Sequence, residues 1–293
     1  MKQINQTLTL FAPAKLNLNL EVVGKDRDNF HFIKSQVCFL KLYDIITLRF
    51  NKNSLILVDK KNSKFCLDEE TILKKTITMF KKRFNWRKNF KITLTKNIPI
   101  GAGLGGGSAD AASLLLGLRK IYNQENNNKV TINNLLTIGK DIGSDVPACI
   151  YSRSLIATGK GENISMCSMP NNKHFLILFP GISISTRSIF QNFDKKKYND
   201  IFVNSFESIK VINSLLPVVS CIEPKIKQIL SILKSLNNVQ SYGMTGSGSA
   251  CFAIFNNIND LKNALRMIKI RRENDWFIWY GKKKEFGFNR FLY

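Results

Sequence analysis

The stretch Pro99–Ala109 reads P-I-G-A-G-L-G-G-G-S-A, and five of its eleven residues are glycines. The preceding residues, Phe90–Ile98, alternate apolar and polar side chains as a half-buried strand does. The following residues, Ala109–Tyr122, begin with small side chains and continue with leucines, which predicts a helix. A glycine loop between a strand and a helix offers free backbone N–H groups and the positive end of the helix dipole to an anion. We therefore predict a phosphate-binding loop rather than a flexible linker, in which Ser108 either caps the helix or binds the same phosphate.

Motifs that the sequence lacks exclude several known types of phosphate-binding loop. G-A-G-L-G-G matches G-x-G-x-x-G, but a dinucleotide fold needs an acidic residue about 20 positions further on, and that position falls near Glu125 in a polar run. No Gly-Lys-Ser/Thr follows the glycines, as a Walker loop requires, and the H-R-D and D-F-G strings of protein kinases are absent. The loop is therefore predicted to bind a nucleotide in another way.

The composition is that of a folded chain with an unusual charge. Its 293 residues are enough for two domains, and 44% apolar and 22% charged residues are ordinary for a globular protein. The net charge of +23 has two interpretations. It could attract nucleic acid or a polyanionic substrate, or it could result from drift in composition. Lysine is spread along the whole chain together with Asn, Ile and Phe, without a basic tail. We favour drift, with phosphorylated ligands as a modest contributor.

Several other classes of protein are disfavoured. The six cysteines contain no C-x-x-C pair and mostly lie in apolar stretches, and the two histidines argue against a zinc site of the His/Cys type. No apolar run approaches the length of a membrane-spanning helix, and Lys15 interrupts the apolar stretch that a signal peptide would need. We expect a cytoplasmic protein with reduced cysteines and no membrane contact.

Three further stretches place polar residues where chemistry is conceivable. A predicted strand near the N-terminus alternates strictly, so Lys15 and Asn17 project from the same face. Phe30 and His31 follow each other in a turn, and Asp145 lies in the turn G-S-D-V-P. Each has an ordinary alternative: a solvated strand face, a packing pair and a helix cap, respectively. Asp145 is alternatively a general base held near a cleft.

The rest of the pattern predicts alternating strands and helices. Two strands around Tyr43–Asp44 are expected within Phe32–Leu48, and an apolar strand is expected after Pro147. The predicted helices are Glu69–Phe84, Thr131–Lys140, two pieces within Ser205–Asn237 and Asn259–Ile270, and a second glycine turn that leads into a buried strand is predicted at Tyr242–Phe255.

Three motifs, taken together, resemble those of the GHMP small-molecule kinases. They are P-A-K-L-N-L-N-L at Pro13–Leu20, P-I-G-A-G-L-G-G-G-S-A-D-A-A from Pro99, and M-T-G-S-G-S-A-C-F at Met244–Phe252, and they span nearly the whole chain. The resemblance implies an α+β protein of GHMP kinase fold. Residues 1–154 would form an ATP-binding domain of the ribosomal protein S5 domain 2-like type, and residues 155–293 a ferredoxin-like C-terminal domain. The active site would lie in the cleft between them.

Within that superfamily, the sequence is most similar to the branch that phosphorylates a cytidine diphosphate-linked methylerythritol at its 2-hydroxyl, on the non-mevalonate route to isoprenoid precursors. Four details carry this similarity: P-A-K-L-N, the F-H pair after R-D-N, G-S-D-V-P, and F-P-G-I-S-I-S-T. The resemblance implies a transferase that uses ATP with Mg²⁺ on a small molecule. The alternatives are another GHMP kinase, of the homoserine or mevalonate type, and a basic nucleic-acid-binding protein with an S5-like fold. The last would leave the glycine loop and Asp145 unexplained.

The resemblance also implies roles for individual residues. Lys15 and Asp145 match the family's catalytic pair: Asp145 would take or orient the hydroxyl proton, and Lys15 would hold Asp145 ionised and steady the developing charge. The positions that match the substrate side, the first three of them around the cytidine, are Asn17, Phe30, His31 and Thr186. The ATP-phosphate loop would comprise Pro99, Ile100, Gly101, Ala102, Gly103, Leu104, Gly105, Gly106, Gly107, Ser108 and Ala109.

Some positions depart from the family pattern. Asn29 and Phe30 stand where the family usually has Gly-Tyr, so the aromatic ring is kept but the hydroxyl is lost, and Asn29 reaches positive φ less freely than glycine. Ala102 replaces a common glycine and Ala109 a common serine, which makes the loop a little stiffer. The sequence names no metal ligand. A monomer or weak homodimer without a specific nucleic-acid partner is expected.

Overall fold

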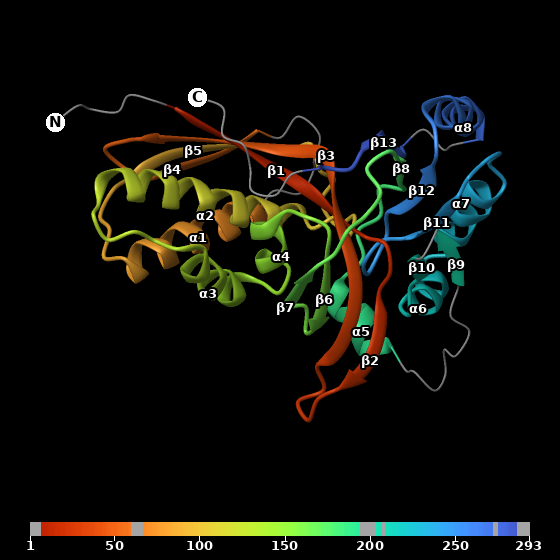
Figure 1. Cartoon of the computed structure of the whole chain (residues 1–293), viewed down its shortest axis with the longest axis horizontal. Coiled ribbons are helices and arrows are strands. Elements are labelled where there is room, and N and C mark those ends of the chain that lie inside the picture. Colours follow the sequence, from red (N-terminus) through yellow and green to blue (C-terminus); the bar gives the residue numbers. More distant parts are fainter. Residues whose placement is uncertain (1–6, 60–66, 194–202, 207–208, 272–274, 286–293) are drawn as a thin grey trace.

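The computed structural model describes residues 7–59, 67–193, 203–206, 209–271 and 275–285 of the chain. The backbone forms two main sheets with helices packed against them, and the long strand β3 (His31–Phe50) runs through the first sheet (Figure 1). Four strands pair with β3: β1 (Leu8–Asn17), β2 (Glu21–Lys25), β5 (Phe90–Thr95) and β6 (Leu155–Gly159). Two outer strands extend the sheet, β4 (Leu55–Asp59) beside β5 and β7 (Asn163–Met166) beside β6.

Four helices lie on one side of the first sheet (Figure 1). They are α1 (Leu67–Arg83), α2 (Gly106–Glu125), α3 (Ile132–Ile142) and α4 (Val146–Tyr151). α2 buries a run of leucines that includes Leu114, Leu115 and Leu118. It approaches β1 so closely that a Cβ on Gly117 would lie 2.7 Å from Leu10 Cδ1, and glycine therefore allows this contact.

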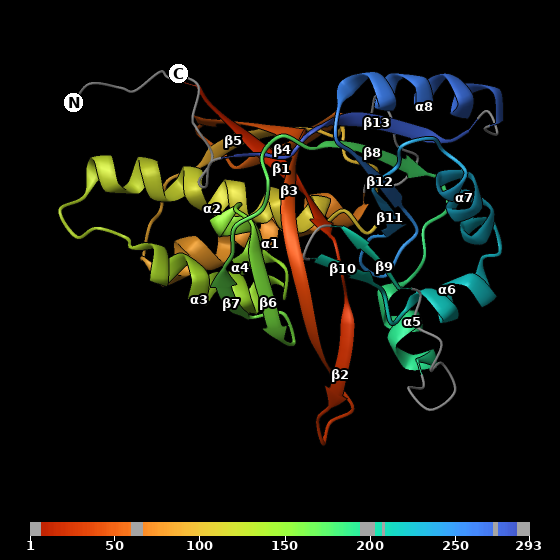
Figure 2. The ribbon, with the colours of Figure 1, turned by 45° about the vertical axis from the view of Figure 1, so that its right-hand side comes forward.

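The second sheet has the order β11–β12–β8–β13 and is antiparallel throughout. Its strands are β8 (His174–Phe179), β11 (Ser241–Met244), β12 (Cys251–Phe255) and β13 (Phe277–Lys282). Figure 2 shows α8 (Ile258–Arg271) lying along this sheet, close to β13. The other elements of this half are α5 (Thr186–Asn192), the hairpin of β9 (Val203–Phe206) and β10 (Ile209–Ile212), α6 (Leu216–Ile222) and α7 (Lys225–Lys234). No helix in the described part of the chain is both long enough and apolar enough to span a bilayer.

A shared apolar cluster joins the two halves of the molecule. Leu16, Leu40 and Leu104 from the first half belong to the same buried cluster as Phe175 and Phe252 from the second. Because this surface is removed from water, it holds the two sheets together. The boundary predicted after residue 154 stays a prediction; β6 and β7, which follow it, pair within the first sheet.

Three predicted elements differ from the structure. Where two strands were predicted around Tyr43–Asp44, β3 is one continuous strand, because Asp44 is fully buried within it and hydrogen-bonded to Lys96, Asn97 and Ile98. The apolar run after Pro147 is the helix α4 and not a strand, since the proline occupies its first turn, where no N–H is needed. Within Ser205–Asn237, helices begin only at Leu216, and strands precede them. α5, β4 and β13 were not predicted. The helices predicted at Glu69–Phe84, Thr131–Lys140 and Asn259–Ile270 are confirmed with shifted ends, as α1, α3 and α8.

Candidate active site

The glycine loop runs from the end of β5 into the first turn of α2. Gly101, Gly103 and Gly105 have φ values of 74°, 76° and 65°, which side chains other than glycine rarely adopt. α2 begins at Gly106, earlier than predicted, so Ser108 lies inside the first turn and Gly105 occupies the N-cap. The interpretation of Ser108 as the cap is therefore wrong. No side chain caps this helix, so its first backbone N–H groups are available to an anion.

A second glycine turn, residues 245–249, packs directly on this loop. A Cβ on Gly103 would lie 2.6 Å from the carbonyl oxygen of Gly248, so the two turns approach closely only because this residue is glycine. The N–H of Ala250 donates to the carbonyl of Ala102 at 3.0 Å. The two halves of the chain therefore meet at their glycine turns.

Lys15 and Asp145, the predicted catalytic pair, form an ion pair. Lys15 Nζ lies 2.7 Å from Asp145 Oδ2. Lys15 follows a bulge in the pairing of β1 with β3, and its N–H donates to the carbonyl of Leu104 at 2.8 Å. Its alkyl chain runs along Gly105, where a Cβ would lie 3.2 Å from Lys15 Cε. The Lys15 side chain thus links the phosphate loop to Asp145.

Asp145 stands at the N-cap position of α4, but its side chain makes no capping hydrogen bond. The interpretation as a helix cap is therefore wrong. The Asp145 side chain is 42% exposed, whereas that of Lys15 is 7% exposed. A carboxylate that solvent can reach and that a buried ammonium holds in place is suited to accept a proton from a substrate.

Asn17 lies two residues beyond Lys15 and is fixed in the same region. Its N–H donates to Thr245 Oγ1 at 2.9 Å, and its Nδ2 donates to Ser35 Oγ at 2.7 Å. Its Oδ1 is buried and accepts no hydrogen bond from the described residues. A buried acceptor without a donor is costly, so this oxygen marks a place where a ligand donor would be favourable.

The turn between β2 and β3 presents Phe30 to solvent. Asp26 accepts the N–H of Phe30 at 2.8 Å, and Asn29 has a φ of 67°, as its place in the turn predicts. Lys160, from the turn between β6 and β7, pairs with Asp26 at 2.8 Å, and its Nζ lies 4.3 Å from the centroid of the Phe30 ring. Because Phe30 is 58% exposed, the interpretation that it packs in the core is wrong.

His31 opens β3 and packs against two aromatic rings of the second half. Its ring centroid lies 5.4 Å from that of Phe190 and 5.7 Å from that of Phe193. Burial, with a smaller contribution from Lys25, lowers the pKa of His31 below its usual value of 6.5. The imidazole is therefore mostly neutral near pH 7 and offers both a donor and an acceptor.

Two further contacts lie in this region. The turn that carries Lys160 lies against the residue before Asp145, since a Cβ on Gly161 would be 3.7 Å from the carbonyl oxygen of Ser144. Thr186 Oγ1 lies 2.7 Å from Ser247 Oγ in the second glycine turn. Of the three residues assigned to the cytidine, Asn17 ends β1 and contacts the second glycine turn, whereas Phe30 and His31 lie where the hairpin of β2 and β3 turns into β3. Figure 1 shows this hairpin extending from the first sheet.

Known proteins match this chain over both halves. Residues 71–153 match the family described as GHMP kinases N terminal domain, and residues 201–273 match GHMP kinases C terminal. A 4-diphosphocytidyl-2-C-methyl-D-erythritol kinase of Ehrlichia canis (strain Jake) is 33% identical over 286 residues, which cover 92% of this chain and 97% of that relative. The chain belongs to the 4-diphosphocytidyl-2-C-methyl-D-erythritol kinase family. A member from Clostridium tetani (strain Massachusetts / E88) is 35% identical over 272 residues, covering 88% of this chain and 94% of the relative.

A solved structure supports the fold of this kinase independently. The crystal structure of a 4-(cytidine 5'-diphospho)-2C-methyl-D-erythritol kinase matches with a TM-score of 0.76 and 24% identity, over 94% of this chain and 98% of that one. The predicted α+β GHMP kinase fold is therefore confirmed. Membership of the family also confirms the prediction of an ATP-dependent small-molecule kinase, and it favours this branch over the homoserine and mevalonate types.

The sequence interpretation did not name several residues that lie in this site. Thr245 and Ser247 are in the second glycine motif. Hydroxyl side chains between glycines are a sequence signal by which they could have been found. Lys160 and Phe190 belong to no motif. Only the folded chain shows their contacts with Phe30 and His31, because the partners are distant in sequence.

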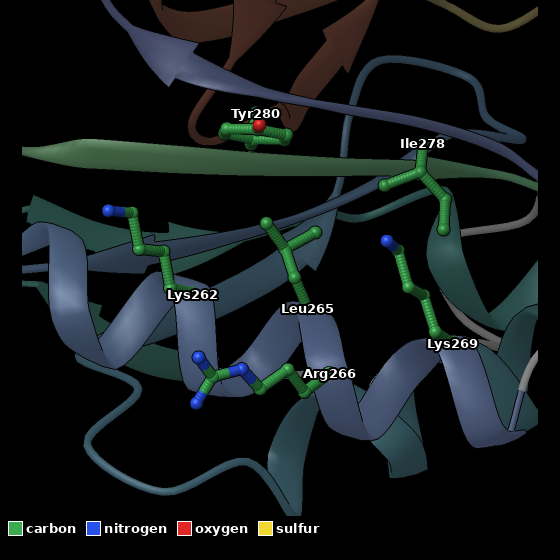
Figure 3. Close-up of a pocket in the computed structure, with 6 residues that line it drawn as sticks. All are labelled: Lys262, Leu265, Arg266, Lys269, Ile278 and Tyr280. Carbon is green, nitrogen blue, oxygen red and sulfur yellow. The ribbon is translucent and has the colours of Figure 1, made fainter.

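One cavity of this kinase lies outside the site. It has a volume of about 330 Å³ and opens between α8 and β13. Figure 3 shows Lys262, Leu265 and Lys269 extending from α8 toward β13. The full lining is Lys262, Leu265, Arg266, Lys269, Ile278 and Tyr280, none of which belongs to the glycine turns or to the ion pair of Lys15 and Asp145.

Proposed function

We propose that this chain transfers the γ-phosphoryl group of ATP to the 2-hydroxyl of 4-diphosphocytidyl-2-C-methyl-D-erythritol, with Lys15 and Asp145 as its catalytic residues. Membership of the family supports the reaction and the substrate. The roles of the two residues are supported by one observation above all, the ion pair that links the phosphate loop to an accessible carboxylate.

The phosphate loop suits the triphosphate of ATP. The first N–H groups of α2 lack intrahelical acceptors, and the helix dipole adds to their attraction for an anion. A Cβ on Gly105 would lie 3.1 Å from Lys15 Cβ. The absence of a side chain at Gly105 therefore lets the Lys15 side chain pass close to the loop backbone. Bound ATP supplies the phosphoryl group, and the loop from Gly105 to Ser108 would hold its phosphates.

Asp145 and Lys15 would have different roles in the transfer to the acceptor hydroxyl. Asp145 would orient the hydroxyl and accept its proton as the oxygen attacks. Lys15 would stabilise negative charge that develops on the transferred group, since phosphoryl transfer depends mainly on positioning and electrostatics. The buried Oδ1 of Asn17, a residue assigned to the cytidine, would accept a hydrogen bond from the amino group of the base.

The cytidine would be recognised on the hairpin of β2 and β3. The exposed ring of Phe30 offers a stacking surface for a base, and stacking on an aromatic side chain is tolerant of geometry. Neutral His31 would read polar groups on the edge of the base. Thr186, at the start of α5, would contact the substrate from the second half of the molecule.

Mg²⁺ is proposed to enter with ATP. Among the described residues there is no group of three His, Cys, Asp or Glu side chains that could hold a metal ion. This fits Mg²⁺, which commonly keeps several waters and binds substrate phosphates with only one or two carboxylates. We also propose a cytoplasmic monomer or weak homodimer without a specific nucleic-acid partner. ATP is available in the cytoplasm, and its reducing conditions keep buried thiols such as Cys38 and Cys251 free.

An assay of ADP release over a panel of alcohols tests the proposed function. With 4-diphosphocytidyl-2-C-methyl-D-erythritol we expect ADP release that requires both substrates and Mg²⁺, and with homoserine or mevalonate we expect none above background. Phosphorus NMR of the product identifies the phosphorylated hydroxyl. ADP release with homoserine or mevalonate alone would contradict the assignment.

A further inference from the structure

Lys96, Asp44 and Asp110 form a buried charged cluster directly behind the phosphate loop. Lys96 Nζ lies 2.5 Å from Asp44 Oδ2 and 2.9 Å from Asp110 Oδ2. The three side chains are at most 2% exposed, and they come from β3, from the residue after β5 and from the start of α2. Charged groups are this deeply buried only where partners compensate the loss of water. We call these three residues the buried cluster.

The buried cluster joins the two ends of the loop. Asp44 Oδ1 accepts the backbone N–H groups of Asn97 and Ile98, at 2.6 and 2.8 Å, where the chain leaves β5. Asp110 lies on α2, where the loop has already become helix. The ammonium of Lys96 binds both carboxylates, so Asp44 at the start of the loop is linked to Asp110 at its end. Charge-assisted hydrogen bonds therefore hold both ends of the loop in place.

The buried cluster also touches the loop at the helix start. A Cβ on Gly106 would lie 3.2 Å from Lys96 Nζ and 3.5 Å from Asp44 Oδ2. Lys15 lies against the adjacent Gly105. The first turn of α2 is therefore held between two lysine side chains, one at the catalytic pair and one in the interior.

We propose that Lys96, Asp44 and Asp110 are positioning residues that hold the phosphate loop in its ATP-binding geometry, an inference that rests on the proposed function in taking this loop as the ATP site. Backbone donors bind an anion well when they are preorganised. Without the buried cluster, the loop conformation that binds ATP is less populated, and the apparent dissociation constant of ATP rises in proportion. The expected signature is lost ATP affinity with unchanged recognition of the alcohol.

The variant Lys96→Met tests this role, because it replaces the ammonium by an apolar side chain of similar length. We expect the dissociation constant of a non-hydrolysable ATP analogue, measured by calorimetry, to rise about tenfold or more. The KM of the alcohol substrate at saturating ATP should change less than about twofold, since the residues that contact it are untouched.

Lys173→Met is the matched control. Lys173 is also a buried lysine, but it precedes β8, and its Nζ donates to Asn256 Oδ1 at 2.7 Å. This variant should lower the melting temperature while leaving the affinity for the analogue unchanged. Wild-type affinity in folded Lys96→Met, or an equal loss in both variants, would overturn the role of the buried cluster while leaving the proposed function intact. If the unaltered protein fails to bind the analogue, the proposed function falls, and this inference falls with it.

Two measurements decide the question even if Lys96→Met does not fold. Asp110→Asn keeps the shape and one acceptor oxygen, and we expect the dissociation constant to rise about threefold or more. In the unaltered protein, the amides of Asn97 and Ile98 should exchange slowly with solvent even without nucleotide, because Asp44 holds them. The first amides of α2 should become slow only when the analogue is bound. Rapid exchange at residues 97 and 98 in the free protein would overturn the proposal.

Discussion

Phe30 is an aromatic side chain that the fold leaves exposed, with Lys160 above its ring. Stacking of a base on such a ring is worth about 1–3 kcal/mol by alanine substitution. Phe30→Ala should therefore lower kcat/KM for the cytidine substrate by roughly one to two decades. Its melting temperature should hardly change, because the ring contributes little to the core. Tyr280→Ala, at an exposed aromatic beside α8, is the control and should affect neither quantity.

The same position tests the identity of the base. Phe30→Tyr restores the family's usual residue and should be neutral or mildly favourable. A substrate with uracil in place of cytosine should lose more activity than Phe30→Ala, since an amino donor becomes a carbonyl acceptor at the edge that His31 would read. Equal rates with the cytosine and uracil substrates would remove Phe30 and His31 from base recognition.

At this scale, the sequence predicts residues that lie in motifs and misses those that do not. Lys15 and Asp145 were found because each lies in a short string that resembles a family motif, and their contact is then a consequence of the fold. Lys160 was missed because a lysine in a turn has no pattern that distinguishes it from the many other lysines of this chain. Its partners Asp26 and Phe30 are more than a hundred residues away in sequence.

At the level of elements, the contact between the two glycine turns makes Gly103 sensitive to substitution. Gly103→Ala would place a Cβ 2.6 Å from the carbonyl oxygen of Gly248, at a residue whose φ is 76°. The backbone conformation alone should cost about 1–3 kcal/mol, and the second glycine turn must also move. We expect a lower melting temperature together with weaker binding of ATP, measured by thermal shift with and without an ATP analogue.

Gly24→Ala is the matched control for that substitution. A Cβ at Gly24, which lies on β2, would be 3.6 Å from Phe32 Cδ2, an ordinary contact. The control should therefore keep the wild-type melting temperature within a few degrees. If Gly103→Ala binds the analogue as the wild type does, the close packing of the two turns is not needed for the ATP site.

Two elements show where the local sequence pattern does not predict the secondary structure. Two strands were predicted around Tyr43–Asp44 where the structure has one, and a carboxylate is rarely found in a buried strand. The partner that makes it possible, Lys96, comes from another element, and a local pattern does not show it. The apolar run from Val146 to Tyr151 was ambiguous between strand and helix, since six residues are too few to reveal a period. The strand, glycine loop and helix around Pro99–Ala109 were predictable because all local signals agree there.

On the scale of the whole molecule, Lys284 connects the end of β13 to the first half. Its Nζ donates to Ser152 Oγ at 3.0 Å, and its N–H donates to the carbonyl of Phe39 at 2.6 Å. Burial lowers the pKa of Lys284 from 10.5 to about 8. Between these two values the unfolded chain binds more protons at this site than the folded one, so the free energy of unfolding increases with pH in that window.

Denaturation by urea at several pH values measures this effect. From about pH 7 to about pH 10, the wild type should gain about 1–3 kcal/mol of stability relative to Lys284→Met, which cannot titrate there. Below the folded-state pKa of about 8 the cost of burying the charge is fully present. Parallel stability profiles for the two proteins would show that Lys284 is not buried at the junction of the two halves.

The action of the paired residues Lys15 and Asp145 on the acceptor hydroxyl is tested most directly by single-turnover transfer from prebound ATP. For Asp145→Asn we expect the rate of phosphoryl transfer to fall roughly 10²- to 10⁴-fold, as loss of a general base commonly does. The dissociation constant of the ATP analogue should change little, because the loop that would hold the phosphates is intact. A transfer rate close to that of the wild type would contradict the role of Asp145, and with it the assignment of this ion pair as the catalytic centre.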